Sequence, residues 1–164
     1  MTSFETCKQY GLQGEADVND WLQTLPGIAN IEDVSDNKFY QDMDIDLFID
    51  LEDGQEIAIE IKTDSLYKTG NFFLETISND YYGTAGCIVK TQSDYVFYYY
   101  PGPGKLYVLP TLALQQWISD NQHRYTPKKT KLPGNLGQYY SIGLCVPREV
   151  LMNEVGGARC HVLH

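Results

Sequence analysis

The chain has 164 residues, which leaves room for one domain built around one hydrophobic core. Hydrophobic residues make up 43% of the chain, too many for an intrinsically disordered protein. With 22 acidic and 12 basic residues the net charge is −10, which excludes a histone-like coat for nucleic acid. The most apolar stretch, 95–114, is interrupted by three prolines and a lysine, so no membrane-spanning helix is expected.

The cysteines and the N-terminus indicate a protein of a reducing compartment. No Cys-x-x-Cys pair connects the four scattered cysteines, which are Cys7, Cys87, Cys145 and Cys160. The first six residues lack the basic and then apolar pattern of a secretory signal. The cysteine and two histidines of residues 160–164 are too few for a structural zinc site, so we expect a frayed, polar C-terminus.

Charge is distributed unevenly along the chain. Residues 1–64 hold 16 acidic and 3 basic side chains, whereas residues 65–164 hold 6 and 9. The segment 122–138 combines prolines and glycines with a cluster of basic residues and is predicted to be a basic loop. Its basic residues are Arg124, Lys128, Lys129 and Lys131. An acidic centre beside a basic loop suits a protein that holds cations and contacts a polyanion, although a solvated linker is the alternative for the loop.

The first half of the chain predicts a helix followed by a β-hairpin. Residues 11–25 carry apolar side chains at helical spacing and end at Pro26-Gly27, and 28–34 form a short strand or an irregular connection. From 41 to 51 apolar residues alternate with acidic ones, which is typical of a half-buried strand. After the turn 52–55 the alternation resumes over 56–64, with isoleucine at 57, 59 and 61. The two runs therefore predict an antiparallel hairpin.

The register of this hairpin follows from its two isoleucine-rich faces. Directly opposed residues share a face, so a three-residue loop that pairs Leu51 with Gln55 brings the apolar faces together. Counting back, this register sets Asp46 opposite Glu60, and it sets Asp44 opposite Lys62. A slip of two residues keeps the same faces and stays open.

The rest of the chain alternates predicted strands with two helices. We expect a turn at 68–71, a loop at 83–86, strands at 72–75, 87–89, 95–100, 105–109 and 139–146, and helices at 111–121 and 147–153. Thr111 is the expected N-cap of the longer helix. The tyrosines at 98–100, 139 and 140 are interpreted as half-buried packing residues rather than base-stacking ones. The expected fold class is α/β of the α+β type, with a central mixed sheet and helices flanking the hairpin.

The acidic hairpin face predicts a metal site. Carboxylates opposed across two strands repel one another, so Asp44, Asp46 and Glu60 are more easily explained if a divalent cation lies between them. Magnesium prefers oxygen ligands and is commonly held by one or two carboxylates. Lys62 follows on the same side, where an ammonium orients a metal-bound water and offsets charge on a phosphorus centre. The alternative is an ordinary solvent-facing hairpin in which Lys62 neutralises Asp44.

These residues resemble the PD-(D/E)XK nuclease superfamily. The resemblance consists of Asp46 and the tripeptide Glu60-Ile61-Lys62 on a hairpin behind a helix that carries Glu15. Further positions are similar to small phage and bacterial members of that superfamily. They are residues 69–71, Glu75, Gly86 and Ser93-Asp94-Tyr95. The match covers about residues 11–95, and residue 45 is Ile where the eponymous motif has Pro.

The resemblance implies a restriction-endonuclease-like core in a single domain, 1–164, that hydrolyses DNA phosphodiester bonds to 5′-phosphate and 3′-hydroxyl ends. Asp46, Glu60 and the backbone carbonyl of Ile61 would ligate Mg²⁺ or Mn²⁺. Lys62 would position the attacking water, and Glu15 would reach the metal through water or support a second ion. Residues farther from the metal would be Asp44, Asn71 and Glu75, and the basic residues of 122–138 would bind DNA.

The implied enzyme would be restriction-, homing- or junction-resolvase-like and would act in the cytoplasm of a bacterial or phage-infected cell. A homodimer is the simple way for such a small enzyme to cut both strands. Two other functions stay open. The first is an acidic DNA mimic, which the balance of −13 over residues 1–64 supports. The second is a member of the family that keeps the fold but is a non-catalytic binding protein.

Overall fold

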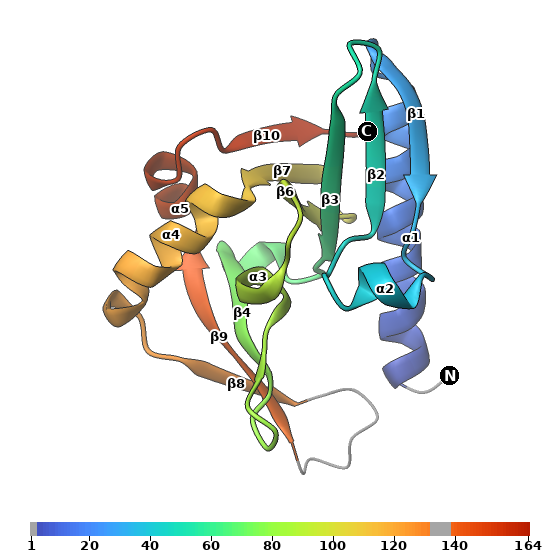
Figure 1. Ribbon diagram of the computed structural model, residues 1–164. Coiled ribbons are helices and arrows are strands. Elements are labelled where there is room, and N and C mark those ends of the chain that lie inside the picture. The colour runs from blue at the N-terminus through green and yellow to red at the C-terminus, as the bar shows by residue number, and fades with distance from the viewer. Residues whose placement is uncertain (1–2, 132–138) are drawn as a thin grey trace.

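The computed structural model describes residues 3–131 and 139–164. It contains a six-stranded sheet in the order β1-β2-β3-β6-β7-β10 and a four-stranded sheet in the order β5-β4-β9-β8 (Figure 1). The strands of the first sheet are β1 (Ile28–Asp33), β2 (Leu47–Leu51), β3 (Glu56–Thr63), β6 (Tyr95–Tyr100), β7 (Lys105–Pro110) and β10 (Arg159–Val162). Those of the second are β4 (Asn71–Asn79), β5 (Thr84–Ala85), β8 (Lys128–Lys131) and β9 (Tyr140–Pro147).

Helices cover both sheets. They are α1 (Ser3–Gln23), α2 (Lys38–Gln41), α3 (Cys87–Lys90), α4 (Thr111–Asn121) and α5 (Arg148–Glu154), with 3-10 turns η1 (Tyr67–Thr69) and η2 (Gln122–Arg124). The first sheet is mixed because β3 and β6 are parallel while its other neighbours are antiparallel. The expected mixed α/β architecture is therefore confirmed. In the part of the chain that the structure describes, no helix is both long and apolar enough to cross a membrane.

Helix α1 packs against one face of the first sheet. Val18 and Leu22 are buried there against Leu47 and Ile59 of the hairpin. Gly14 makes the closest approach, because a Cβ at this position would lie 2.1 Å from Oγ1 of Thr63 at the end of β3. The absence of a side chain at residue 14 thus sets the position of α1 over the end of β3.

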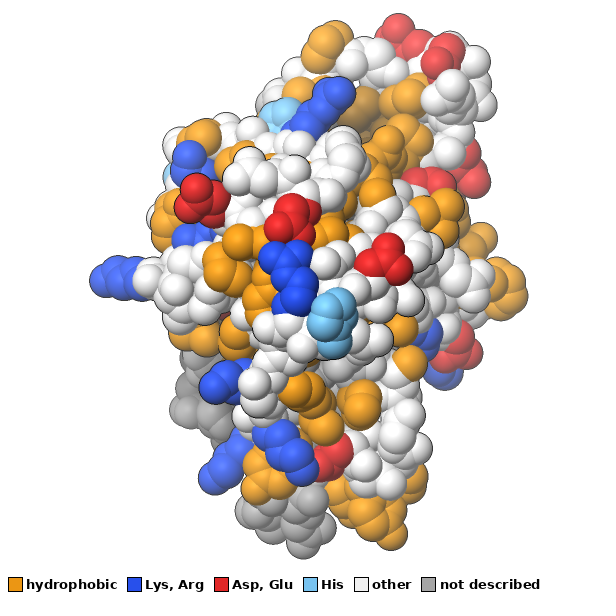
Figure 2. Space-filling model, turned by 90° about the vertical axis from the view of Figure 1, so that its left-hand side faces the viewer, with side chains coloured by type: hydrophobic (Ala, Val, Ile, Leu, Met, Phe, Trp, Pro, Cys, Tyr) orange, Lys and Arg blue, Asp and Glu red, His pale blue; other side chains and the backbone are white. Residues whose placement is uncertain are grey.

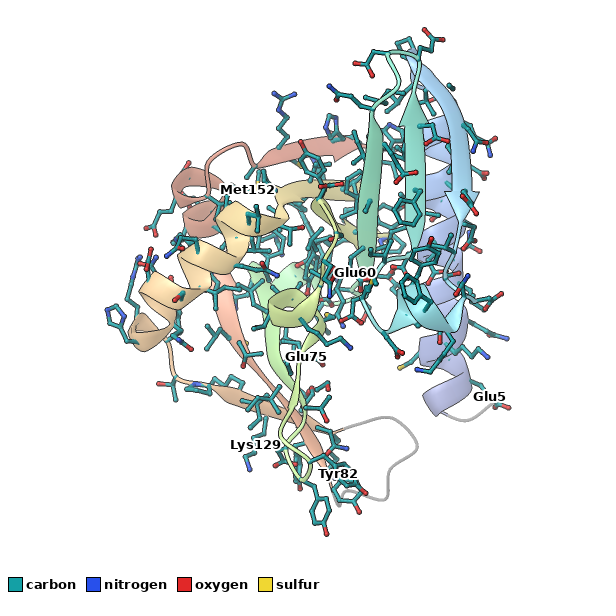
Figure 3. All side chains as sticks on the ribbon, viewed as in Figure 1. Glu5, Glu60, Glu75, Tyr82, Lys129 and Met152 are labelled. Atoms are coloured by element: carbon teal, nitrogen blue, oxygen red, sulfur yellow. The ribbon has the colours of Figure 1, made fainter. Side chains whose placement is uncertain are left out.

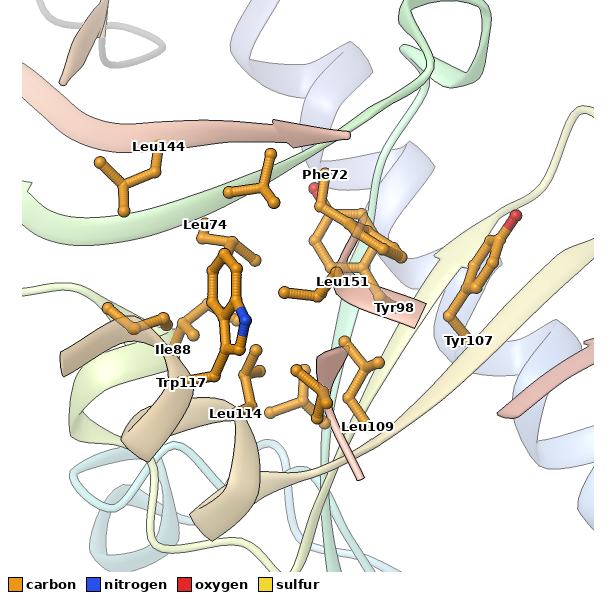
Figure 4. Close-up of a cluster of buried hydrophobic side chains, with 14 of the residues drawn as sticks. Phe72, Leu74, Ile88, Tyr98, Tyr107, Leu109, Leu114, Trp117, Leu144 and Leu151 are labelled. Atoms are coloured by element: carbon orange, nitrogen blue, oxygen red, sulfur yellow. The ribbon is translucent and has the colours of Figure 1, made fainter. Parts of the chain in front are cut away.

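A larger hydrophobic cluster lies between the two sheets and helices α3, α4 and α5 (Figure 4). Its members include Phe72, Leu74, Tyr98, Leu114, Trp117 and Leu151. Tyr98, Tyr99 and Tyr100 are fully buried, not half-buried as predicted. Their burial is tolerated because each hydroxyl donates a hydrogen bond. The acceptors are Asp64 at 2.6 Å, Asp17 at 3.1 Å and the carbonyl of Asn71 at 2.8 Å.

The hairpin has the predicted register. Leu47 pairs with Ile59 and Ile49 with Ile57, and the amide of Leu51 donates to the carbonyl of Gln55 at 2.8 Å. The first strand, however, begins only at Leu47. The predicted strand residues before it form α2 and a turn in which Asp44 has φ +48°. Ile45 therefore packs in a small separate cluster, and the alternation over 41–46 does not reflect strand geometry.

Four other predictions were wrong in part. Residues 87–90 form helix α3 instead of a strand, and Pro110 rather than Thr111 is the N-cap of α4, while Thr111 Oγ1 lies 3.1 Å from Ser93 Oγ. The C-terminus is not frayed, because β10 pairs with β7. The segment 122–138 is not simply a loop: it contains η2 and β8, which pairs with β9, and its residues 132–138 lie outside the described part.

Candidate active site

Asp46 and Glu60 form the centre of the site. Asp46 directly precedes β2, and the paired register of the hairpin ends at Leu47 and Ile59. The amide of Asp46 donates to the carbonyl of Ile59 at 2.9 Å, and its Oδ2 accepts a hydrogen bond from the amide of Ile61 at 2.7 Å. The carboxyl groups of Asp46 and Glu60 are close enough for each to shift the pKa of the other. The two acids are therefore neighbours, although Asp46 lies just before the strand and not within it.

Burial and mutual repulsion change the protonation of this pair. Burial, followed by the charges of Asp46 and Asp44, raises the pKa of Glu60 well above its usual range. Burial also raises the pKa of Asp46, but hydrogen bonds from the Ile61 amide and from Glu60 act in the opposite direction. Of the two acids, Glu60 is thus the one whose protonated form the fold favours more strongly.

Glu15 joins this pair from helix α1. It follows Gly14, where α1 touches the end of β3. Burial raises the pKa of Glu15 to about 7, and the charges of Asp46, Asp33 and Asp36 contribute further. The contribution of Asp46 indicates that the helix places Glu15 within electrostatic range of Asp46.

Lys62 lies two residues after Glu60 on the same face of β3. The pKa of Lys62 is raised most by the ionised form of Cys87, whereas burial lowers it. The charges of Glu75, Glu60 and Asp64 raise it further. Burial raises the pKa of the Cys87 thiol itself to about 12, so this group is neutral at pH 7. The carboxylates are therefore the charges that keep Lys62 protonated at neutral pH, which makes it a cation rather than a general base.

Asp44 belongs to the cluster but not to the strand. Its charge raises the pKa of Glu60, and Lys62 lowers the pKa of Asp44, whose overall shift is upward because of burial. Its Oδ2 lies 3.3 Å from Nζ of Lys90 but has no hydrogen bond within the described residues. Lys90 is thus the ion-pair partner of Asp44. This pairing has no signal in the sequence, where residues 87–89 are predicted to be a strand.

The two other residues predicted around the metal have different surroundings. Glu75 on β4 acts on Lys62, and Gly86 brings the start of α3 against β4, since a Cβ there would lie 2.3 Å from the carbonyl of Glu75. Figure 3 shows Glu75 below Glu60. The carbonyl of Asn71, in contrast, accepts hydrogen bonds from Tyr100 and Arg148.

The side chains fit a hard divalent cation. Burial raises the pKa of Glu60, Asp46 and Glu15, and a divalent cation would stabilise their ionised forms. The same cluster holds Oδ2 of Asp44, which has no hydrogen bond within the described residues. Within the described ranges, no set of three or more His, Cys, Asp or Glu side chains is spaced to enclose a metal. Magnesium does not require such a cage, because one or two carboxylates with water and substrate phosphate suffice.

The basic residues predicted to bind DNA fall into two groups. Arg124 in η2 forms an ion pair with Glu154 at 2.7 Å. The three lysines lie on β8 at the edge of the second sheet, where Lys129 forms an ion pair with Asp80 at 3.2 Å. Lys128 and Lys131 are exposed. The lysines of β8 are thus the better placed group for a polyanion.

Comparison with known proteins adds no assignment: no family model, curated protein or solved structure matches the chain. The evidence on the class of protein therefore lies in the fold and in the cluster of Glu15, Asp46, Glu60 and Lys62.

Proposed function

We propose that the protein is a metal-dependent DNA endonuclease of the PD-(D/E)XK type. The observation that carries this proposal is the proximity of Asp46, at the start of β2, to Glu60 on β3, with Lys62 on the same face as Glu60 and Glu15 within electrostatic range of Asp46. The chain order of helix α1, the hairpin β2–β3 and then β6, which is parallel to β3, supports a restriction-endonuclease-like core.

Asp46, Glu60 and the backbone carbonyl of Ile61 would hold Mg²⁺ or Mn²⁺, and Glu15 would support the ion through water. When bound, the metal supplies Lewis-acid stabilisation of the phosphate and lowers the pKa of a bound water. Lys62 stays protonated, so its part is to orient the water and offset the charge that develops on phosphorus. Metal binding favours the ionised form of Glu60, whose pKa burial raises, and proton release is therefore part of the proposal.

A DNA mimic is the second candidate, and the burial of the acidic cluster argues against it. A mimic needs carboxylates spread over its surface at the spacing of phosphates. Glu60, in contrast, is only 8% exposed, and Asp46 faces it rather than solvent. A cytoplasmic location and a homodimer that presents two sites to the two DNA strands complete the proposal.

Cleavage of plasmid and branched DNA with and without Mg²⁺ tests the proposed activity. We expect cutting only with the metal, and a loss of at least about 100-fold in Lys62→Ala, because a charge that stabilises the transition state is removed. Lys68→Ala, at an exposed lysine of η1, is the matched control and should cut normally. Absence of cutting, combined with metal-independent binding to a DNA-processing protein, would instead identify the mimic.

A further inference from the structure

The turn between β4 and β5 presents two neighbouring tyrosines to solvent. Tyr81 is 69% exposed and Tyr82 is 72% exposed. Their rings lie edge to face with centroids 4.9 Å apart, and both pack against Tyr139, at 5.0 and 6.1 Å. Figure 3 shows Tyr82 at the lower end of the molecule, beyond Lys129. Exposed aromatic rings gathered at one point are typical of a contact surface.

Hydrogen bonds hold this tyrosine turn, residues 79–83, in a fixed shape. Oδ1 of Asn79 accepts from the amides of Tyr81 at 3.0 Å and Tyr82 at 3.2 Å. Asp80 exchanges two bonds of 2.9 Å with the backbone of Tyr140, one to its carbonyl and one from its amide. Gly83, at φ +65°, completes the turn. The rings are therefore positioned before any partner arrives, which lowers the entropic cost of binding.

Positive charge lies beside the tyrosine turn in a protein of net charge −10. The three lysines of β8 belong to the same sheet, and Lys131 pairs with Tyr140, whose backbone anchors the turn. The acid of the turn, Asp80, is already paired with Lys129. Figure 2 shows several basic side chains over the lower part of that side of the molecule, with an acidic side chain beside them. This local charge is complementary to phosphate.

We propose that Tyr81 and Tyr82 form a stacking platform for unpaired bases, while the lysines of β8 contact the phosphates of the same strand. Aromatic rings stack on the faces of bases, and a continuous duplex hides those faces, so the platform selects DNA with a single-stranded or branched part. This inference rests on the proposed function in taking DNA as the polymer, and it specifies the substrate class.

The sheet gives the distance between the platform and the active site. Strand β4 runs from Glu75, which acts on Lys62, to the tyrosine turn, and six residues at about 3.3 Å each span about 20 Å. Lys128 shares the face of Glu75, because both residues pair with Gly143. At 3.4 Å per nucleotide, a strand stacked on the platform would reach the site about six nucleotides away.

Fluorescence anisotropy with labelled DNA in EDTA tests the platform without cleavage. The probes are a blunt duplex, a single strand and a duplex with splayed ends. We expect the double variant Tyr81→Ala, Tyr82→Ala to lose about 5- to 150-fold in affinity for the single strand and the splayed duplex, and less than about twofold for the blunt duplex. The matched variant Tyr81→Phe, Tyr82→Phe keeps the rings and should retain the affinity, as should Phe39→Ala at another exposed aromatic residue.

The platform is refuted if the alanine variant binds splayed DNA like wild type, or if wild type prefers the blunt duplex. It is also refuted if the alanine variant changes only self-association in sedimentation, because the turn is then a protein contact. The platform and the nuclease can fail separately. If the alanine variant binds splayed DNA like wild type but cuts plain duplex with Mg²⁺, the nuclease proposal stands and the platform is refuted. If wild type binds single strands through the tyrosines but cuts no DNA, the platform stands and the nuclease proposal is refuted.

Discussion

The substitution Glu60→Gln isolates the energetic consequence of placing two carboxyl groups together. In the folded protein without metal, the pKa of Glu60 is raised well above its usual range, whereas an unfolded glutamate releases its proton near pH 4.3. While the folded state binds one more proton than the unfolded state, the free energy of unfolding falls with rising pH, by about 1.4 kcal/mol per pH unit. The fall ends where the pH passes the raised pKa of Glu60 in the folded protein.

Glutamine at residue 60 reproduces the protonated acid, because its amide N–H donates to Asp46 and it carries no proton to lose. We therefore expect equal stabilities at about pH 4 and below, and a variant that becomes progressively more stable than wild type as the pH rises towards 7. Urea unfolding in EDTA, followed by the fluorescence of Trp21 and Trp117, measures the difference. Glu15 changes the free energy of unfolding with pH in the same direction in both proteins, so its effect largely cancels in the difference between them. Glu149→Gln, at an exposed position of α5, is the control. Parallel pH profiles for wild type and Glu60→Gln would refute the raised pKa of Glu60.

Three further outcomes are expected. Asp46→Asn should abolish cutting while the melting temperature stays equal or rises, since the charge that opposes ionisation of Glu60 is lost; a large drop in melting temperature would contradict this. Lys128→Glu with Lys129→Glu should weaken DNA binding and lower the slope of log K against log salt by about 2, and an unchanged slope would remove β8 from the interface. Gly14→Ala should destabilise the fold by about 1–3 kcal/mol in denaturant unfolding, because the added Cβ meets Thr63, and normal stability would show that α1 shifts freely.

The hairpin and its register were predictable because a period of two, a glycine turn and a strictly apolar face leave few alternatives. The same pattern failed at residues 41–46, where acidic and apolar residues also alternate but α2 and the turn at Asp44 intervene. A tertiary contact stabilises the turn at Asp44, because the Thr91 hydroxyl donates to the carbonyl of Asp44 at 2.6 Å. The two residues are 47 positions apart, so the contact leaves no local signal in the sequence.

The site was predictable as far as it depends on the hairpin. Asp46, Glu60 and Lys62 follow from strand alternation, whereas Lys90 and Cys87 reach the cluster from α3, through the close contact of Gly86 with β4. The C-terminal strand β10 was missed because its polar residues carry no strand periodicity, and its pairing with β7 brings together residues about 50 positions apart.

Titration calorimetry with Mg²⁺ and Mn²⁺ in buffers of different ionisation enthalpy tests most directly whether Asp46 and Glu60 bind a divalent cation. The proposal predicts uptake at pH 7 with release of protons, because the ion favours the ionised form of Glu60, whose pKa burial raises. Asp46→Asn should lose the uptake, and Glu60→Gln should lose the proton release. No heat of binding in wild type, or uptake unchanged by Asp46→Asn, would contradict the metal site and with it the proposed nuclease.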